Sequence, residues 1–245
     1  MNDFKNIGYK DFAKFASDET MSDNEKIGFP DSYRESFDEA ILADIVTKLP
    51  NIEEKCTFLD IGPGCSNLSR KLLKKLLTNN SDINLIDSKE MLDLIDNNNK
   101  ITKMPGFYPN DFLATKKLEK KFDAILCYSV LHYIIKESSL WDFIDLSISF
   151  LKEGGQFLIG DIPNLSKRKR FFSSEKGKAF HKNFMKTNEN PKVDWNESPI
   201  GEIDDSVICS IISRSRAQGC EAYIVPQRYD LPMQNRREDV IIIKP

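Results

Sequence analysis

An aspartate and two glycines follow a short apolar stretch in the segment Phe58–Ser66, directly before a leucine-rich helical pattern. A glycine turn that opens a helix offers free backbone N–H groups, which in dinucleotide-binding proteins hold a pyrophosphate. Here the carboxylate of Asp60 stands two residues before Gly62, where it would repel a diphosphate. The third glycine of the dinucleotide fingerprint is also missing, because Asn67 occupies its position. The segment therefore favours a ligand that carries positive charge.

These residues suit S-adenosylmethionine, which carries an ammonium and a sulfonium, better than they suit NAD. Gly62 and Gly64 would let the backbone turn sharply and approach the methionine part of this ligand. A second acid, Asp87, ends the expected strand 83–87, where a carboxylate can accept hydrogen bonds from both hydroxyls of a ribose. NAD enzymes use the same contact, so Asp87 indicates a nucleoside without choosing between the two cofactors.

The pattern around these residues predicts an α/β fold. From Cys56 onward, expected strands at 57–60, 83–87, 122–127 and 156–160 are separated by expected helices at 68–77, 90–96 and 140–150. Such alternation builds right-handed βαβ units and a parallel sheet with helices on both faces. Near the C-terminal end, Asp204 or Asp205 is expected to cap a helix over 206–218, and strands 222–225 and 240–243 are expected to pair as a long hairpin.

In their order and spacing, these segments resemble the class I S-adenosylmethionine-dependent methyltransferases over roughly residues 52–245. The matching features are the acid and glycines at Asp60, Gly62 and Gly64, the acids Asp87 and Asp111, and a strand-four motif at 127–133. The resemblance implies a Rossmann-like, mostly parallel seven-stranded sheet with an antiparallel last strand and helices on both faces. One departure is Ser66, which stands at the family's third glycine position.

The resemblance also implies roles for individual residues. Asp60 would orient the methionyl ammonium, the segment 88–91 would line the adenine, and Asp111 would accept a hydrogen bond from the adenine amino group. The structural alternatives are an ordinary strand-to-helix turn, a helix cap, and a turn aspartate beside core residues. The expected cofactor-binding residues are Asp60, Gly62, Gly64, Ser66, Asp87, Ser88, Met91, Asn110, Asp111, Phe112, Cys127 and Tyr128.

Two residues are candidates for a catalytic base. Methyl transfer is an in-line displacement at a sulfonium, so the protein mainly aligns donor and acceptor and excludes water. A hydroxyl acceptor needs a base in addition, and histidine titrates closest to neutral pH. His132 is the first candidate, with a structural helix-start role as its alternative, and Asp161 is the second. Cys127 is expected to be a buried apolar residue and not a nucleophile.

Composition bounds the remaining possibilities. A chain of 245 residues with 40% hydrophobic content predicts one core with appendages. The expected parts are an N-terminal helical lid (1–50) that includes Tyr9, Phe12 and Tyr33, a cofactor-binding α/β core (51–161), a substrate-side insert (162–203) and a C-terminal helix and hairpin (204–245). No metal site is expected, since the chain has two histidines and no C-x-x-C pair.

The charge and the hydropathy pattern favour a small-molecule partner. A net charge of −3 and the lack of base-methylating motifs argue against nucleic acid. No apolar run reaches the roughly 18–20 residues that span a bilayer, and no signal-peptide pattern is present, so a cytoplasmic protein is expected. The basic run 167–170 could meet an anionic acceptor or form a solvated helix face. The oligomeric state is left open.

The sequence thus predicts a methyltransferase that acts on a small polar acceptor. The segment 226–239 is loosely similar to methyltransferases of bacterial surface-polysaccharide clusters, which implies a sugar, a nucleotide-sugar or a phosphorylated capsule precursor, methylated on oxygen or nitrogen. The alternatives are a non-catalytic S-adenosylmethionine- or nucleoside-binding regulatory module and an NAD-linked oxidoreductase.

Overall fold

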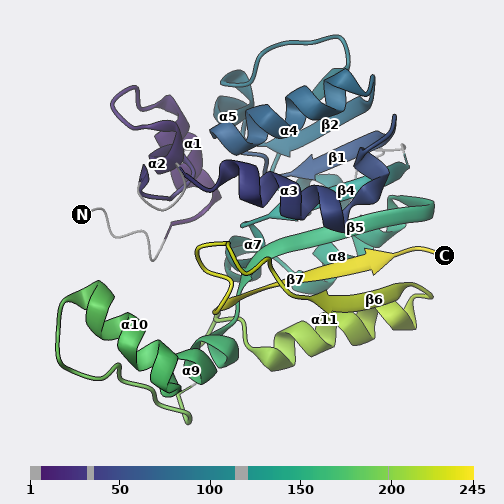
Figure 1. Cartoon of the computed structure of the whole chain (residues 1–245). Helices are drawn as coiled ribbons and strands as arrows, with labels where there is room; N and C mark the ends of the chain where they lie inside the picture. The colour runs from purple at the N-terminus through teal and green to yellow at the C-terminus, as the bar shows by residue number, and fades with distance from the viewer. Residues whose placement is uncertain (1–6, 32–35, 114–120, 198) are drawn as a thin grey trace.

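A seven-stranded sheet in the order β3-β2-β1-β4-β5-β7-β6 forms the centre of the molecule (Figure 1). The computed structural model describes residues 7–31, 36–113, 121–197 and 199–245. β1 to β5 pair in parallel, whereas β7 runs antiparallel between β5 and β6, which confirms the predicted fold class and terminal strand pair. The strands are β1 (Thr57–Ile61), β2 (Asp82–Asp87), β3 (Ile101–Pro105), β4 (Phe122–Tyr128), β5 (Leu151–Pro163), β6 (Glu221–Val225) and β7 (Arg237–Ile243).

Helices lie on both faces of this sheet, and α9 and α10 project away from it (Figure 1). The structure describes eleven α-helices in residues 7–31, 36–113, 121–197 and 199–245. They are α1 (Tyr9–Ser17), α2 (Asp23–Lys26), α3 (Asp38–Lys48), α4 (Asn67–Thr78), α5 (Lys89–Asp93), α6 (Asn110–Leu113), α7 (Leu131–Glu137), α8 (Leu140–Ser149), α9 (Leu165–Ser173), α10 (Glu175–Met185) and α11 (Asp205–Ala217). Asp204 caps α11 through hydrogen bonds from the backbone of Ser206 and Val207, as its sequence position predicts. None of the described helices combines the length and apolarity needed to cross a membrane.

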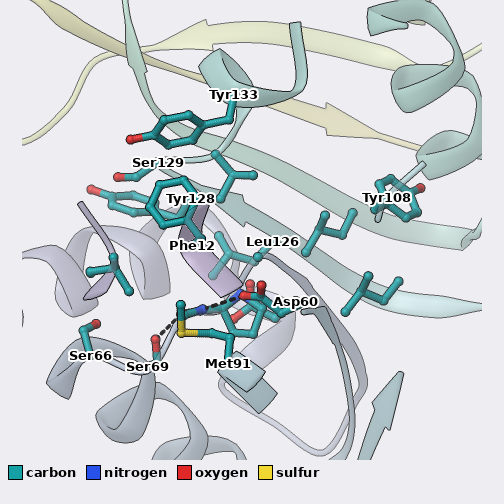
Figure 2. Close-up of a pocket in the computed structure, with 18 of the residues that line it drawn as sticks. Phe12, Asp60, Ser66, Ser69, Met91, Tyr108, Leu126, Tyr128, Ser129 and Tyr133 are labelled. Atoms are coloured by element: carbon teal, nitrogen blue, oxygen red, sulfur yellow. Dashed lines mark hydrogen bonds between the residues drawn. The ribbon is translucent and has the colours of Figure 1, made fainter. Parts of the chain in front are cut away.

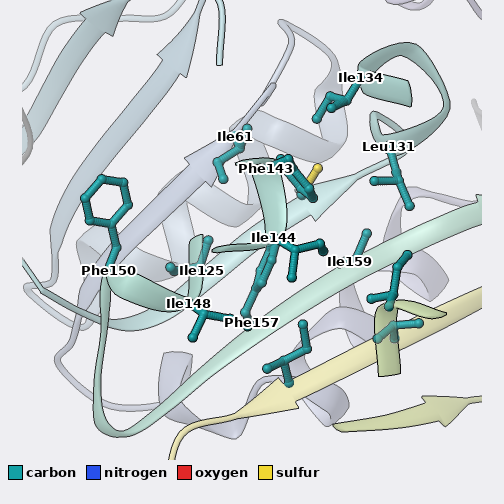
Figure 3. Packing of buried hydrophobic residues seen from close by; sticks show 14 of the residues in the cluster. Ile61, Ile125, Leu131, Ile134, Phe143, Ile144, Ile148, Phe150, Phe157 and Ile159 are labelled. Atoms are coloured by element: carbon teal, nitrogen blue, oxygen red, sulfur yellow. The ribbon is translucent and has the colours of Figure 1, made fainter. Parts of the chain in front are cut away.

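Alternating side chains of β4 supply two apolar cores. Ala124 and Leu126 face the cluster built with α3 and α4, whereas Ile125 and Cys127 face the cluster under α7, α8 and α11. In the second cluster Phe143 packs against Phe157 with ring centroids 5.8 Å apart (Figure 3). The alternation fixes which residues at the end of β4 can reach a site on the α3–α4 side.

A buried charged network ties α3 to the C-terminal strand. Lys48 Nζ lies 2.6 Å from both Asp44 Oδ2 and Asp239 Oδ2, and the three side chains are 10%, 3% and 0% exposed. Asp239 Oδ1 accepts hydrogen bonds from the backbone N–H of Asp161 (2.8 Å) and from Gln227 Nε2 (3.0 Å). The network therefore also fixes the backbone at the carboxyl end of β5.

The segment from α9 to the start of α11 leaves the body of the protein and returns to the same place. The backbone N–H of Leu165 donates to the carbonyl oxygen of Ile203 at 2.7 Å, so the two ends are joined. Between them, α9 and α10 pack side by side, away from the sheet (Figure 1). A Cβ on Gly177 would collide with the carbonyl oxygen of Phe171, so this close packing depends on glycine.

Candidate active site

A cleft with an empty volume of about 1070 Å³ lies over the carboxyl ends of β1, β2 and β4. The order of the sheet reverses at β1 and β4, and ligands of open α/β sheets bind in the crevice at such a switch point. Asp60 comes from β1, Asp87 from β2, and Leu126 and Tyr128 from β4. Figure 2 shows labelled side chains from β1 and β4 and from α1, α4, α5 and α7 around the cavity.

The glycine turn after β1 forms one wall of this cleft. Gly62 and Gly64 have φ angles of +75° and +63°, which L side chains rarely adopt. A Cβ on Gly62 would lie 2.6 Å from Val130 Cγ2, and a Cβ on Gly64 would lie 2.7 Å from Ile27 Cγ2. Glycine is thus required here both by the backbone conformation and by the close packing of neighbouring side chains.

Two carboxylates face the cleft from neighbouring strands. Burial raises the pKa of Asp60 to about 8, and the nearby charge of Asp87 contributes to this rise. Burial also raises the pKa of Asp87 to about 6. Hydrogen bonds from the backbone N–H groups of Ser88 (2.7 Å) and Gly64 (3.1 Å) lower this pKa and offset part of the rise. A cation placed between these two buried groups would favour their charged forms and lower both pKa values.

Aromatic side chains close the cleft on the side opposite the sheet. Tyr9 of α1 lies against Phe107, with ring centroids 4.9 Å apart, and Phe12 meets Tyr133 edge to face at 4.8 Å. Glu137 Oε2 accepts a hydrogen bond from the backbone N–H of Tyr9 at 2.7 Å, which attaches α1 to α7. Tyr9 and Phe12 therefore cover the cleft, whereas Tyr33 lies outside the described residues.

Comparison with known proteins identifies a domain in the middle of the chain. Residues 59–159, which contain the glycine turn and both carboxylates, match the methyltransferase domain family. The chain thus contains a methyltransferase domain, and S-adenosylmethionine is its cofactor. No curated protein matches the methyltransferase in sequence.

Solved structures share the fold of this methyltransferase over nearly the whole chain. The plantazolicin methyltransferase BpumL, in complex with a monoazolic desmethylPZN analog and S-adenosylhomocysteine (SAH), is 14% identical, with a TM-score of 0.57 over 96% of this chain and 97% of that one. The N-methyltransferase NodS from Bradyrhizobium japonicum WM9, in complex with SAH, is 12% identical, with a TM-score of 0.56 over 97% and 98%.

Seven of the expected cofactor-binding residues of the methyltransferase line the cleft. They are Asp60, Gly62, Gly64, Ser66, Asp87, Met91 and Tyr128. The structure places the other five beside it. Ser88 caps α5 by accepting a hydrogen bond from the backbone N–H of Met91 (3.2 Å), and Asn110 accepts one from Ser138 Oγ. Asp111 accepts the backbone N–H of Phe107 at 2.8 Å and so holds the loop after β3.

Phe112 and Cys127 lie in the apolar core of the methyltransferase and are 3% and 0% exposed. Cys127 points to the α8 side because β4 alternates, so its neighbours Leu126 and Tyr128 reach the cleft instead. The sequence interpretation missed Phe107 and Tyr108, which line the cleft directly after β3. An aromatic pair after a Gly in the segment Pro105–Pro109 was the available signal.

The two candidate bases of the methyltransferase lie next to the cleft, at the end of β5 and the start of α7. Burial, and then the charge of Arg237, lower the pKa of His132 to about 3. Its Nδ1 atom is buried and has no hydrogen-bond partner among the described residues. Asp161 lines a small adjoining pocket of about 290 Å³ that shares Phe29 and Tyr128 with the main cleft.

Ser129 connects the cleft of the methyltransferase to Asp161. Its side chain lines the cleft, and its Oγ donates a hydrogen bond to Asp161 Oδ2. Both residues have positive φ angles, +63° for Ser129 and +56° for Asp161, which cost non-glycine residues free energy and cluster at functional sites. Asp161 is further held by Gln227 Nε2 (3.3 Å) and Arg237 Nη1 (3.4 Å).

The raised pKa of Asp60 predicts that stability depends on pH. Between about pH 4 and pH 8, the folded methyltransferase keeps a proton on Asp60 that the unfolded chain has released. The corresponding stability is present at low pH and is lost as the pH rises through the folded-state pKa. We therefore expect the Asp60→Asn variant to gain stability relative to the wild-type protein between about pH 5 and about pH 9. Urea unfolding of the ligand-free proteins measures this, and a difference that stays constant with pH would contradict it.

Proposed function

We propose that this methyltransferase transfers the methyl group of S-adenosylmethionine to a small polar acceptor in the cleft between α1 and the sheet. S-adenosylmethionine supplies a methyl group on a cationic sulfur that an acceptor attacks in line. The observation that carries the proposal is the pair of carboxylates, Asp60 and Asp87, in one cleft beside the glycine turn. Carboxylates stabilise a nearby cation and repel a diphosphate.

The contacts of Asp87 support a role in holding the ribose. Each carboxylate oxygen accepts one backbone N–H, from Ser88 and Gly64, and each oxygen has a second lone pair. The carboxylate is therefore fixed in place and can accept two ribose hydroxyls. Asp60, deeper in the cleft, would face the methionyl ammonium.

An apolar slot next to Asp87 fits the adenine ring. We place the ring between Met91 and Phe107, which both line the cleft. Asp111 holds the backbone of Phe107, so it would position this side chain. In this arrangement Asp111 would affect adenine binding indirectly, because it fixes the loop that carries Phe107.

For the acceptor, we propose a sugar, a nucleotide-sugar or a phosphorylated precursor, methylated on oxygen or nitrogen. BpumL, which is similar in fold, has been solved with desmethylPZN analogs, and NodS is an N-methyltransferase. The similarity in fold to these two enzymes is compatible with an acceptor that is a small molecule or a peptide. A screen of amino sugars, nucleotide-sugars and short peptides with S-adenosylmethionine labelled in its methyl group would identify it.

The proton of the acceptor would pass to Asp161 through Ser129. Ser129 Oγ faces the cleft and donates to the Asp161 carboxylate, so a proton taken up by Ser129 has a path to a buried acid. Ser129 links Asp161 to the cleft, whereas His132, the other candidate, does not line the cleft. We therefore place Asp161 before His132 as the base.

Calorimetric titration tests the donor. We expect S-adenosylmethionine and SAH to bind and NAD to bind weakly or not at all. In the Asp87→Ala variant, we expect the affinity for SAH to fall by roughly tenfold or more, because hydrogen bonds to a charged acceptor contribute about 1.5–3 kcal/mol.

The matched control for this test is Asp82→Ala, which removes a carboxylate at the opposite end of β2. Asp82 is half-exposed and lies 3.4 Å from Lys100 Nζ, far from the glycine turn along the strand. SAH affinity should be unchanged in this variant. Unchanged affinity in Asp87→Ala would remove Asp87 from the site, and tight binding of NAD with no binding of SAH would overturn the proposed function.

A further inference from the structure

The insert contains a second cavity, separate in its lining residues from the cleft. It lies between α9, α10 and the segment 191–197, with an empty volume of about 620 Å³. Its polar lining includes the side chains of Arg168, Lys169, Lys192 and His181, together with two acids, Asp194 and Glu197. With three permanent cations against two carboxylates, the lining has a net positive charge.

The basic run at the start of α9 is divided between the body of the protein and this cavity. Lys167 Nζ donates to the carbonyl oxygen of Arg237 (2.7 Å), and Arg170 pairs with Asp205. These two cations are therefore used to attach the insert. Arg168 and Lys169 turn to the cavity instead.

The two cavity-facing cations of α9 differ in how they are held. Lys169 Nζ donates to the carbonyl oxygen of Glu197, which leaves its charge unneutralised. The Arg168 guanidinium lies over the ring of Phe172, 5.7 Å from its centroid. Among the described residues, neither Arg168 nor Lys192 has a carboxylate within ion-pair distance. Stacking orients a guanidinium and keeps its N–H groups available for an anion.

The walls of the cavity are held in place by aromatic packing. Phe172 meets His181 edge to face at 6.2 Å, and Phe171 packs on both Phe172 (5.1 Å) and Phe180 (5.7 Å). The close approach of α10 to α9 at Gly177 restricts movement of the two helices relative to each other. A cationic group held in advance by packing binds an anion at a smaller entropic cost.

The cavity is within reach of the transfer site. Leu165 lines the cavity, and Asp161, four residues earlier, lines the pocket beside the cleft. Four residues of extended chain span at most about 14 Å. One end of an acceptor of moderate length could therefore lie in the cavity while its other end is methylated.

We propose that this cavity binds the anionic end of the methyl acceptor, a phosphate or a carboxylate attached to a flat apolar group. This inference rests on the proposed function for the identity of the acceptor, but the binding of the anion can be tested without it. Arg168 and Lys192 contact the anion, and Phe172 and His181 pack against the attached group.

The fluorescence of Trp195 can report on binding. The chain has two tryptophans, and Trp195 lies in the segment that lines the cavity, whereas Trp141 lies on α8. In a Trp141→Phe background, phenyl phosphate and benzoate should change the Trp195 emission in a saturable manner. Benzyl alcohol and benzylamine, which lack the negative charge, should not. Comparison of phenyl phosphate with benzoate distinguishes a phosphate site from a carboxylate site.

Two double variants separate a specific site from general attraction. In Arg168→Ala/Lys192→Ala, we expect the dissociation constant for phenyl phosphate to rise by roughly tenfold or more, as expected for loss of charge-assisted hydrogen bonds. Lys74→Ala/Lys176→Ala removes the same charge from exposed positions on α4 and α10 and should leave binding unchanged. Equal binding by both double variants, or equal binding of benzyl alcohol, would overturn the proposal.

Two further measurements distinguish the possible failures. SAH binding in the cleft, measured by calorimetry, should be the same in wild type and in both double variants. SAH binding without anion binding overturns this inference alone, whereas anion binding without SAH binding overturns the proposed function. With an acceptor from the screen, Arg168→Ala/Lys192→Ala should raise KM and leave kcat unchanged. An unchanged KM would show that the cavity binds a free anion and not the acceptor.

Discussion

Replacement of Asp161 by asparagine is expected to lower kcat for methyl transfer by about 10²–10⁴-fold, the usual contribution of a general base. An amide keeps most of the shape of the carboxylate but cannot take up a proton. Because Asp161 lies outside the lining of the main cleft, the affinity for SAH should remain close to that of the wild type. Single-turnover assays with an acceptor from the screen measure the first effect, and calorimetry measures the second.

The pH profile separates a chemical role of Asp161 from a structural one. In the wild-type enzyme, kcat should fall at low pH as the base becomes protonated, and Asp161→Asn should lose this limb. Ser129→Ala should also lower kcat, since it removes the hydroxyl that links the cleft to Asp161. His132→Ala should change kcat by less than about tenfold, because His132 does not line the cleft. If His132→Ala lost most of its kcat while Asp161→Asn kept the wild-type kcat, His132 and not Asp161 would be the base.

Replacement of Lys48 by methionine is expected to lower the free energy of unfolding by about 3–5 kcal/mol, since it leaves buried carboxylates without their cation. Lys48 Nζ lies 2.6 Å from Asp44 and from Asp239, both almost fully buried. Burial already raises the pKa of Asp239 despite the ammonium. Urea unfolding at neutral pH measures the change.

The same substitution at Lys71 provides the control for Lys48. Lys71 pairs with Glu39, whose side chain is 78% exposed, and such surface pairs contribute about 0–1 kcal/mol. Lys71→Met should therefore leave stability nearly unchanged. Similar losses in both variants would mean that the Lys48 network contributes no more than an ordinary surface ion pair.

Much of the fold can be predicted because strong periodicity coincides with burial. The leucine stripe of α4 and the apolar runs of β1, β2 and β4 lie at or near full burial, and the predicted ranges agree with the observed elements within about two residues. The sequence pattern does not predict a range for β3, whose residues are exposed or only partly buried at the sheet edge. Helices α9 and α10 are also missed, since their apolar residues pack on each other and not on the main core.

The residues of the candidate site also include some that the sequence predicts and others that it does not. Asp60, Asp87 and the two glycines can be recognised because they follow strands at fixed short distances, and the structure brings them into one cleft. Tyr9 and Phe12, which the sequence assigns to an N-terminal lid, also line the cleft, whereas the contribution of Tyr133 from α7 is seen only in the tertiary arrangement. Cys127 is expected among the cofactor-binding residues because it lies near the end of β4. Its side chain points to the opposite face of the sheet, into the apolar core.

The hydrogen bond between Leu165 and Ile203 has a consequence for how such enzymes diversify. A segment whose ends meet can be lengthened, shortened or exchanged while the flanking strand and helix keep their positions, since loop-closure entropy changes slowly with length. Recombination at these two residues would then give a chimera that retains its donor chemistry and acquires the selectivity of another enzyme.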